Sequence, residues 1–270
     1  MFLTEPQPTP YDLHFHIFGT AVRVSPYFWL ANALLGWELA QALDGIGREA
    51  SPGPGMLLLL WIAGVFVSIL VHELGHVWAM RYYGIRASIV LYHFGGLAVP
   101  ESTMSYLSFS RGTRRENQMV ISAAGPGAEF ALAIVLLLLI RLAGYHLRFP
   151  IPYLDRVLPL ADGGTPISSF PLEAFLFFVI LPSVYWALMN LLPVYPLDGG
   201  HIARDICLRI SPQDGVRTSL ILSVITGAAV AAYAVTKNDF FLAIMFGMLA
   251  VSSFQVLQAY SGRGGGYGPW

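Results

Sequence analysis

The sequence predicts an all-α polytopic membrane protein with about six transmembrane helices and a small β-hairpin or re-entrant element near its active site. Hydrophobic residues make up 56% of the 270 residues and charged residues only 11%, whereas soluble domains carry about 25% charged residues. Several apolar runs reach the length of about 20 residues that a membrane-spanning helix needs. A polar His-Glu-x-x-His motif at residues 72–76 lies inside one of these runs. A soluble domain with a large apolar core is therefore excluded.

Composition also limits the partners and the domain organisation. The net charge is −1, which gives no reason to expect nucleic acid binding. The single cysteine, Cys207, excludes an internal disulfide framework and a cysteine-rich zinc site. We expect one transmembrane domain over residues 1–260, followed by a flexible Gly-rich tail over residues 261–270.

Hydrophobic periodicity and turn residues predict the elements in order. Residues 15–24 predict an extended segment with a turn at Gly19, and residues 87–99 predict two short strands about Gly95 and Gly96. A short amphipathic helix is expected at 201–210, and Gly125-Pro126-Gly127 predicts a break or kink in the third span. The six predicted spans are residues 27–42, 56–83, 117–142, 170–192, 216–235 and 240–260.

The His-Glu-x-x-His motif brings two imidazoles and a carboxylate together on one predicted helix. Residues i and i+4 share a helix face, so His72 and His76 can bind the same metal ion, with Glu73 beside them to act on a water molecule. Charged side chains inside a membrane cost roughly 2.5–3.5 kcal/mol each on insertion scales. Two histidines and a glutamate at one depth therefore indicate a shared function.

The third ligand of such a site must come from another part of the chain, because a catalytic zinc usually takes three protein ligands. Asp198 is the best candidate, since it follows the predicted fourth span in the sequence Pro-Leu-Asp-Gly-Gly-His. Taken alone, Asp198 would be interpreted as the N-cap of the helix expected at 201–210, where aspartate is favoured.

Loop charges predict the orientation, because cytoplasmic loops carry the excess of Lys and Arg. With six spans, ten of the 15 basic residues fall on the side that holds both termini and the 2–3 and 4–5 loops. Five fall on the other side: Arg48, Arg141, Arg148, Arg156 and Lys237. The first side is predicted to be cytoplasmic, with Arg111, Arg114 and Arg115 marking a membrane boundary. The same topology brings Asp198 and the His-Glu-x-x-His end of span two to one membrane face.

Two motifs carry a family resemblance: His72-Glu73-Leu74-Gly75-His76 in one span, and the run Asn-Leu-Leu-Pro-Val-Tyr-Pro-Leu-Asp-Gly-Gly at residues 190–200 after a later span. This pair resembles the site-2 protease family of intramembrane zinc metalloproteases, and the Gly95-Gly96 hairpin and Gly125-Pro126 also fit that pattern. The resemblance implies that His72, His76 and Asp198 bind one zinc ion and that Glu73 is the catalytic base. It further implies that Asn190 lies near the oxyanion, although Asn190 could instead cap its helix before Pro193.

One position departs from the family pattern. Relatives commonly carry Asn three residues after the Gly-Pro pair, whereas this chain has Glu129. A carboxylate in a span tends to face protein or water, so Glu129 could hydrogen-bond near the site or serve the fold, and both interpretations stay open. His93 and His201 are open in the same way, as groups near the substrate or as ordinary structural histidines.

The resulting hypothesis is an intramembrane zinc metalloendopeptidase, with one zinc ion per chain, that cleaves transmembrane segments of membrane proteins. The alternatives are a membrane metal or ion transporter and a non-catalytic membrane scaffold. A transporter would spread acidic residues and histidines over several spans, whereas here they cluster at one end, and a scaffold would have lost a ligand or Glu73. The expected partners are a transmembrane protein substrate and the lipid bilayer, and a regulatory membrane partner stays open. We expect the inner (cell) membrane of a bacterium, with both termini and the active-site end cytoplasmic.

Overall fold

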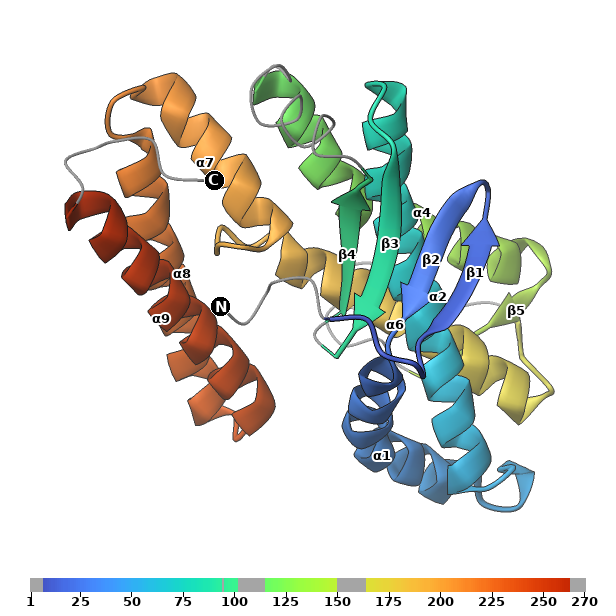
Figure 1. The fold of residues 1–270 in the computed structure, drawn as a ribbon. Helices are drawn as coiled ribbons and strands as arrows, with labels where there is room; N and C mark the ends of the chain where they lie inside the picture. The colour runs from blue at the N-terminus through green and yellow to red at the C-terminus, as the bar shows by residue number, and fades with distance from the viewer. Residues whose placement is uncertain (1–6, 94, 102–114, 150–163, 263–270) are drawn as a thin grey trace.

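The computed structural model describes residues 7–93, 95–101, 115–149 and 164–262, and most of them are helical (Figure 1). The helices are α1 (Pro26–Gly47), α2 (Pro54–Tyr82), α4 (Arg115–Leu142), α6 (Phe170–Asn190), α7 (Asp198–Ile210), α8 (Gly215–Thr236) and α9 (Phe240–Gly262). The strands are β1 (Leu13–Ile17), β2 (Thr20–Val24), β3 (Ala87–Tyr92), β4 (Gly95–Pro100), β5 (Tyr145–His146) and β6 (Thr165–Pro166). Residues 263–270 of the tail expected at 261–270, and Arg111, Arg114 and Arg156 of the charge argument, lie outside the described residues, whereas residues 261–262 belong to α9.

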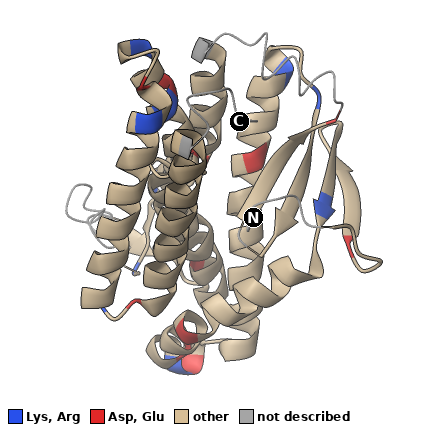
Figure 2. Cartoon of the chain, turned by 60° about the vertical axis from the view of Figure 1, so that its left-hand side comes forward, with Lys and Arg blue, Asp and Glu red and all other residues tan. Residues whose placement is uncertain are grey.

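Five helices of the described residues, α2, α4, α6, α8 and α9, are long and apolar enough to cross a membrane. They coincide with the second to sixth predicted spans to within about two residues at each end. Helix α1 occupies the predicted first span with 22 residues, but Asn32, Glu38 and Asp44 make it less apolar, and it does not meet the same criterion. Figure 2 shows most of the charged positions toward the two ends of the bundle, with a few on the sheet and within the helices. The chain is an integral, multi-pass membrane protein.

A four-stranded sheet covers one side of α2 (Figure 1), in the order β1-β2-β3-β4. The sequence predicted an extended segment with a turn over residues 15–24 and two short strands over residues 87–99. The structure forms a strand pair in each region and joins the two pairs through a parallel pairing of β2 with β3 that places Val22 opposite Ile89. Parallel strands need a long crossover connection, which α1 and α2 supply here. Val22 and Ile89 are buried against Val65 and Ile69 of α2. The turn between β3 and β4 precedes Gly95, so the prediction that centred it on Gly95-Gly96 was wrong by about two residues.

The loop between α6 and α7 is held from two sides, and it positions the start of α7. A Cβ atom added at Gly199 would overlap the backbone carbonyls of Leu191 and Leu192, so only glycine lets this loop fold back so closely. The N–H of Tyr195 donates to Ser223 Oγ of α8 at 3.1 Å, and Ser253 Oγ of α9 donates to the Tyr195 carbonyl at 3.2 Å. These contacts fix the position of Asp198, the first residue of α7.

Candidate active site

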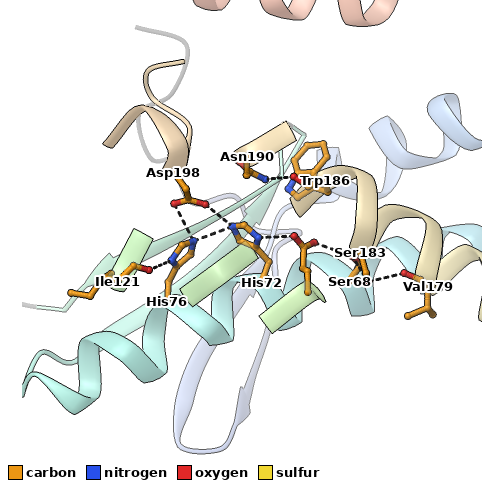
Figure 3. Close-up of polar contacts among 10 residues, drawn as sticks. Ser68, His72, His76, Ile121, Val179, Ser183, Trp186, Asn190 and Asp198 are labelled. Carbon is orange, nitrogen blue, oxygen red and sulfur yellow. Dashed lines mark hydrogen bonds and ion pairs between the residues drawn. The ribbon is translucent and has the colours of Figure 1, made fainter. Parts of the chain in front are cut away.

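His72, His76 and Asp198 meet at one point in the structure (Figure 3). His72 Nε2 lies 3.0 Å from His76 Nε2, and the Asp198 carboxylate oxygens lie 3.2 Å from His72 Nε2 and 3.4 Å from His76 Nε2. Ligand atoms bound to a tetrahedral zinc ion at about 2.0–2.1 Å are roughly 3.3 Å from each other. The spacing of the three side chains therefore fits zinc.

The hydrogen bonds behind the two imidazoles support the same conclusion. His76 Nδ1 lies 2.7 Å from the Ile121 carbonyl oxygen, and a carbonyl can only accept, so Nδ1 carries the proton and Nε2 presents a lone pair. His72 Nδ1 likewise faces an oxygen, Glu129 Oε2, at 2.8 Å. The Nε2 atoms then point toward each other and toward a carboxylate, an arrangement of acceptors that a cation satisfies.

Helix α2 carries the site into the apolar part of the bundle. His72 lies about 27 Å along the helix from Pro54, at 1.5 Å per residue, and the hydrocarbon core of a bilayer is about 30 Å thick. His72, Glu73 and His76 are each at most 8% exposed. The two ligands and Glu73 are therefore shielded within the protein near one end of a membrane-spanning helix.

Asp198 is the first residue of α7, and the preceding Leu197 takes the N-cap position. Asp198 is therefore not the N-cap, which was the alternative interpretation of its sequence context. The positive end of the α7 dipole favours a carboxylate at this position. Asp198 thus meets the imidazoles as an anion.

Glu73 lies against strand β4. A Cβ atom added at Gly96 would overlap the Glu73 carboxylate, so β4 can approach this closely only because Gly96 has no side chain. The Ala98 backbone donates a hydrogen bond to the same carboxylate. Glu73 is thereby fixed beside the metal-ligand cluster, where the motif placed it.

Helix α4 approaches the histidine rings at Gly125. A Cβ atom there would lie 2.8 Å from His72 Nε2 and would overlap His76 Nε2. Helix α4 runs without interruption through Pro126, so a break at Gly125-Pro126-Gly127 is absent, and a kink there stays a prediction. The glycine serves the close approach of α4 to the site.

Glu129, whose role the sequence left open, contacts His72 directly. Its Oε2 atom lies 2.8 Å from His72 Nδ1, and its Oε1 atom accepts from Ser68 Oγ at 3.0 Å. The signal that could have located it is its spacing: Gly125 and Glu129 are four residues apart and share one face of α4. Once Gly125 faces the histidines, Glu129 must lie near them as well.

The remaining candidates differ in their distance from the site. Asn190 ends α6, with its Nδ2 donating to the Trp186 carbonyl at 3.0 Å, and Leu191 is the C-cap, so Asn190 is not the cap. His201 packs on Tyr195 and borders the same cavity as Asp198, and burial lowers the pKa of its imidazole. His93 is exposed and lies near α1 with Tyr27 and Leu30, so the structure does not bring it to the site.

A cavity of about 500 Å³ adjoins the ligand cluster. Its walls come from α2, β4, α4, α6, α7 and α9, so segments far apart in the sequence enclose it. The apolar part of the wall includes Trp186 of α6 and Met245 and Met248 of α9. The size and the mixed lining suit a short stretch of extended polypeptide.

A centre of two buried histidines on a membrane-spanning helix and a carboxylate at the start of α7, with a glutamate beside it, defines a membrane-embedded metal site of the metallopeptidase type. The model of peptidase family M50 matches residues 60–232, more than half of the chain. The chain belongs to this family, which confirms the resemblance predicted from the motifs.

Two curated proteins and one solved structure are similar to this chain. Zinc metalloprotease MJ0392 of Methanocaldococcus jannaschii is 26% identical over 195 residues, which cover 72% of this chain and 44% of that protein. The Synechocystis sp. protein sll0528, provisionally described as a zinc metalloprotease, is 27% identical over 198 residues with the same coverage of 72% and 44%. The solved structure of a site-2 protease from Methanocaldococcus jannaschii aligns with a TM-score of 0.49 and 21% identity, over 91% of this chain and 94% of that one. The chain spans less than half the length of the curated relatives.

Proposed function

We propose that this chain is an intramembrane zinc endopeptidase that hydrolyses a peptide bond within a transmembrane segment of a protein substrate. The observation that carries the proposal is the convergence of His72, His76 and Asp198, whose ligand atoms lie within 4.8 Å of one another. They lie beside Glu73 and a cavity, and both histidines are on α2, a helix able to cross a membrane. A soluble substrate would not require a site at this depth.

The residues divide the chemistry between them. His72, His76 and Asp198 would hold the zinc ion, which when bound makes a water molecule a competent nucleophile near neutral pH. The Glu73 carboxylate, fixed beside the ligand cluster, would accept a proton from the attacking water and return it to the leaving amine. The Ala98 hydrogen bond and the nearby Gly96 backbone keep the carboxylate oriented for both transfers.

Strand β4 offers the substrate a backbone to pair with. The bond from Glu101 N–H to the Arg86 carbonyl, 3.0 Å long, sets the alternation of hydrogen-bonded pairs between β3 and β4. This alternation turns the backbone groups of Gly96 and Ala98 outward, and β4 is the last strand in the sheet order. The Ala98 N–H already donates to Glu73, so the Ala98 carbonyl and the Gly96 backbone are the groups offered to a substrate. Both residues border the cavity. A substrate helix that has unwound locally can add to this edge as a strand, with its carbonyls exposed.

Asn190 has the chemistry to stabilise the oxyanion that forms at the attacked carbonyl. A side-chain amide carries two N–H groups, and the bond to Trp186 uses one of them. Asn190 is buried and borders the cavity. Replacing it with alanine should lower kcat by about 10²–10³ while zinc stays bound, because one oxyanion donor typically contributes that factor.

The surroundings of the site fit a substrate that arrives through the bilayer. Helices α8 and α9 pack on each other and α8 packs on α7, while α9 supplies one apolar wall of the cavity.

We place the site toward the cytoplasmic face of a bacterial inner membrane, on the basis of the excess of arginine in the loops on that side. Because the ionisable groups near the site converge on one centre and do not line a path, they favour an enzyme over a transporter.

The experiment that tests the proposal compares the wild-type chain with Glu73→Gln in liposomes that contain labelled single-span substrates. Wild type should bind about one zinc ion and release substrate fragments, and Glu73→Gln should bind zinc equally but lose cleavage. Glu38→Gln, an exposed glutamate of α1, is the control and should cleave normally. Undiminished cleavage by Glu73→Gln would refute the mechanism.

A further inference from the structure

Glu129 is a fully buried carboxylate that the proposed reaction does not use. It lies within α4, with no exposed surface, and both of its oxygens are engaged. We propose that Glu129 is the positioning residue of the metal centre, which holds the His72 imidazole in the tautomer and rotation that present Nε2 to zinc. The inference rests on the ligand set of the proposed function.

The first argument is the geometry at His72. An imidazole ring rotates over a broad range about its terminal torsion, and either ring nitrogen can carry the proton in the neutral form. The 2.8 Å contact between Glu129 Oε2 and His72 Nδ1 fixes both choices. The opposite nitrogen is then directed at His76 and Asp198. Donation of its Nδ1–H to a carboxylate also makes the histidine a stronger metal ligand.

The second argument is that Glu129 is itself fixed from a third helix. Ser68 Oγ of α2 donates to Glu129 Oε1 at 3.0 Å, and Ser183 Oγ of α6 lies 3.0 Å from Ser68 Oγ (Figure 3). Ser183 also lies 2.7 Å from the Val179 carbonyl of its own helix. Ser183, Ser68 and Glu129 therefore form one buried series of polar side chains across α6, α2 and α4, and this series ends at His72. A carboxylate held in this way has little freedom to move away from His72.

The third argument is the contrast with His76, whose Nδ1 is held by the Ile121 backbone carbonyl at 2.7 Å. That partner belongs to the main chain and cannot be altered by substitution. His72 depends on a side chain, so the two ligands differ in what secures them. Removal of Glu129 should therefore loosen one ligand and leave the other in place.

The test measures zinc affinity by competition with a chromophoric chelator, together with the visible absorption of the cobalt-substituted protein in detergent. Glu129→Ala should lower zinc affinity about 10–100-fold and change the cobalt spectrum, because His72 no longer has a fixed orientation. Glu129→Gln retains an acceptor of similar reach and should recover part of the affinity. Ser68→Ala should give a smaller loss in the same direction.

The matched control is Glu173→Gln, which alters another glutamate without exposed surface, in α6, paired with Arg148. It should leave zinc affinity and the cobalt spectrum unchanged. Equal zinc loss in Glu173→Gln and Glu129→Gln would assign the effect to general destabilisation and overturn the inference. Unchanged affinity and spectrum in Glu129→Ala would overturn it as well.

His72→Ala separates this inference from the proposed function. If His72→Ala retains zinc, the proposed ligand set is wrong, and the inference fails with it. If His72→Ala loses zinc while Glu129→Ala and Glu129→Gln match wild type, the ligand set stands and only the positioning role is wrong.

Discussion

The two ends of the helix bundle both bury ionisable groups, but they satisfy them in opposite ways. Near the start of α6, Glu173 has no exposed surface and accepts from Arg148 Nε at 2.9 Å and from Arg148 Nη2 at 2.8 Å. Arg148 also donates to the Ile167 carbonyl at 2.8 Å. Every carboxylate oxygen there meets a donor of the chain itself. Near the end of α6, the three ligand side chains meet as acceptors.

This difference separates structural from functional burial. A buried ion pair whose hydrogen bonds are complete is part of the fold and needs no bound ion or ligand. A buried cluster of acceptors is costly unless a cation binds to it. Here Gly96 and Gly125 allow β4 and α4 to pack closely against the site, and Glu129 contacts His72. Substitutions at the two ends should therefore be read by different measurements, namely metal content at one and thermal stability at the other.

The largest effect is expected from Asp198→Ala at the ligand end. It removes one of three ligands and leaves two imidazoles, so bound zinc should fall from about one per chain to well below that value. The measurement is metal content by mass spectrometry after gel filtration. Asp214→Ala, at an exposed aspartate that precedes α8, should retain zinc. Unchanged zinc in Asp198→Ala would remove Asp198 from the ligand set.

At the opposite end, Arg148→Ala should lower stability by about 2–3 kcal/mol and leave zinc content unchanged. Removing one member of a buried ion pair leaves the other charge buried without a partner, which typically lowers the stability by about 3–5 kcal/mol. The expected cost is smaller here because the Arg148 side chain is 46% exposed and its backbone N–H still donates to Glu173. The measurement is the thermal unfolding midpoint in detergent. Loss of zinc at an unchanged midpoint would break the comparison.

The combined substitution Arg148→Met and Glu173→Leu sharpens this result. Replacing both members of a buried pair with apolar residues is often neutral or stabilising, so the double variant should recover most of the midpoint. A double variant as unstable as Arg148→Ala would mean that the pair is required for more than mutual neutralisation.

Local patterns in the sequence predicted most of the fold. Apolar runs bounded by glycine and proline, such as the one that opens at Gly53-Pro54, located five membrane-spanning helices to within about two residues. Alternating residues located both regions that form strand pairs. The parallel pairing of β2 with β3 was missed, because a strand pattern reports only that a segment is extended and does not identify its partner. That information lies in long-range contacts such as Val22 with Ile89.

The part of the site that lies within one helix turn could be predicted from the sequence, whereas the part contributed by other helices was harder to predict. The i, i+4 rule brought His72 and His76 together, and the membrane topology brought Asp198 to the same face. Glu129 depends on the rotation of α4 about its own axis, which hydrophobicity alone does not determine in a helix surrounded by lipid and protein. The contact of Gly125 with the histidine rings specifies that rotation.

The next prediction tests the close approach of α4 at the ligand end. Gly125→Ala should cost about 1–2 kcal/mol of stability through overpacking and should weaken zinc binding, because the new methyl group must displace His76. Gly127→Ala is the matched control on the same helix, with nothing within 4 Å of the added Cβ, and should stabilise by about 0.5–1 kcal/mol. Chelator competition and thermal unfolding measure both variants. Equal behaviour of the two would show that α4 does not confine the rings.

The smallest effect concerns a second ion pair, which lies away from both ends of α6 and holds the β1–β2 hairpin. Asp12 accepts from Arg23 Nη1 at 2.9 Å and from Thr9 Oγ1 at 2.6 Å. Burial raises the pKa of Asp12, but these hydrogen bonds outweigh it, so the pKa lies below its ordinary value. The stabilisation is therefore complete above the unfolded pKa of about 3.9 and is lost as the pH falls through the lower, folded value.

Acidification from pH 5 to pH 3 should accordingly loosen the hairpin by about 1 kcal/mol or less, which amide hydrogen exchange of β1 and β2 can measure. Asp12→Asn should exchange faster at pH 5 and lose this component of the pH dependence, since an amide does not titrate in this range. The β3–β4 pair provides an internal reference, because Asp12 does not contact it. If Asp12→Asn kept the full pH dependence of β1 and β2, another group would be responsible, and the pairing of Asp12 with Arg23 would contribute nothing measurable to the hairpin.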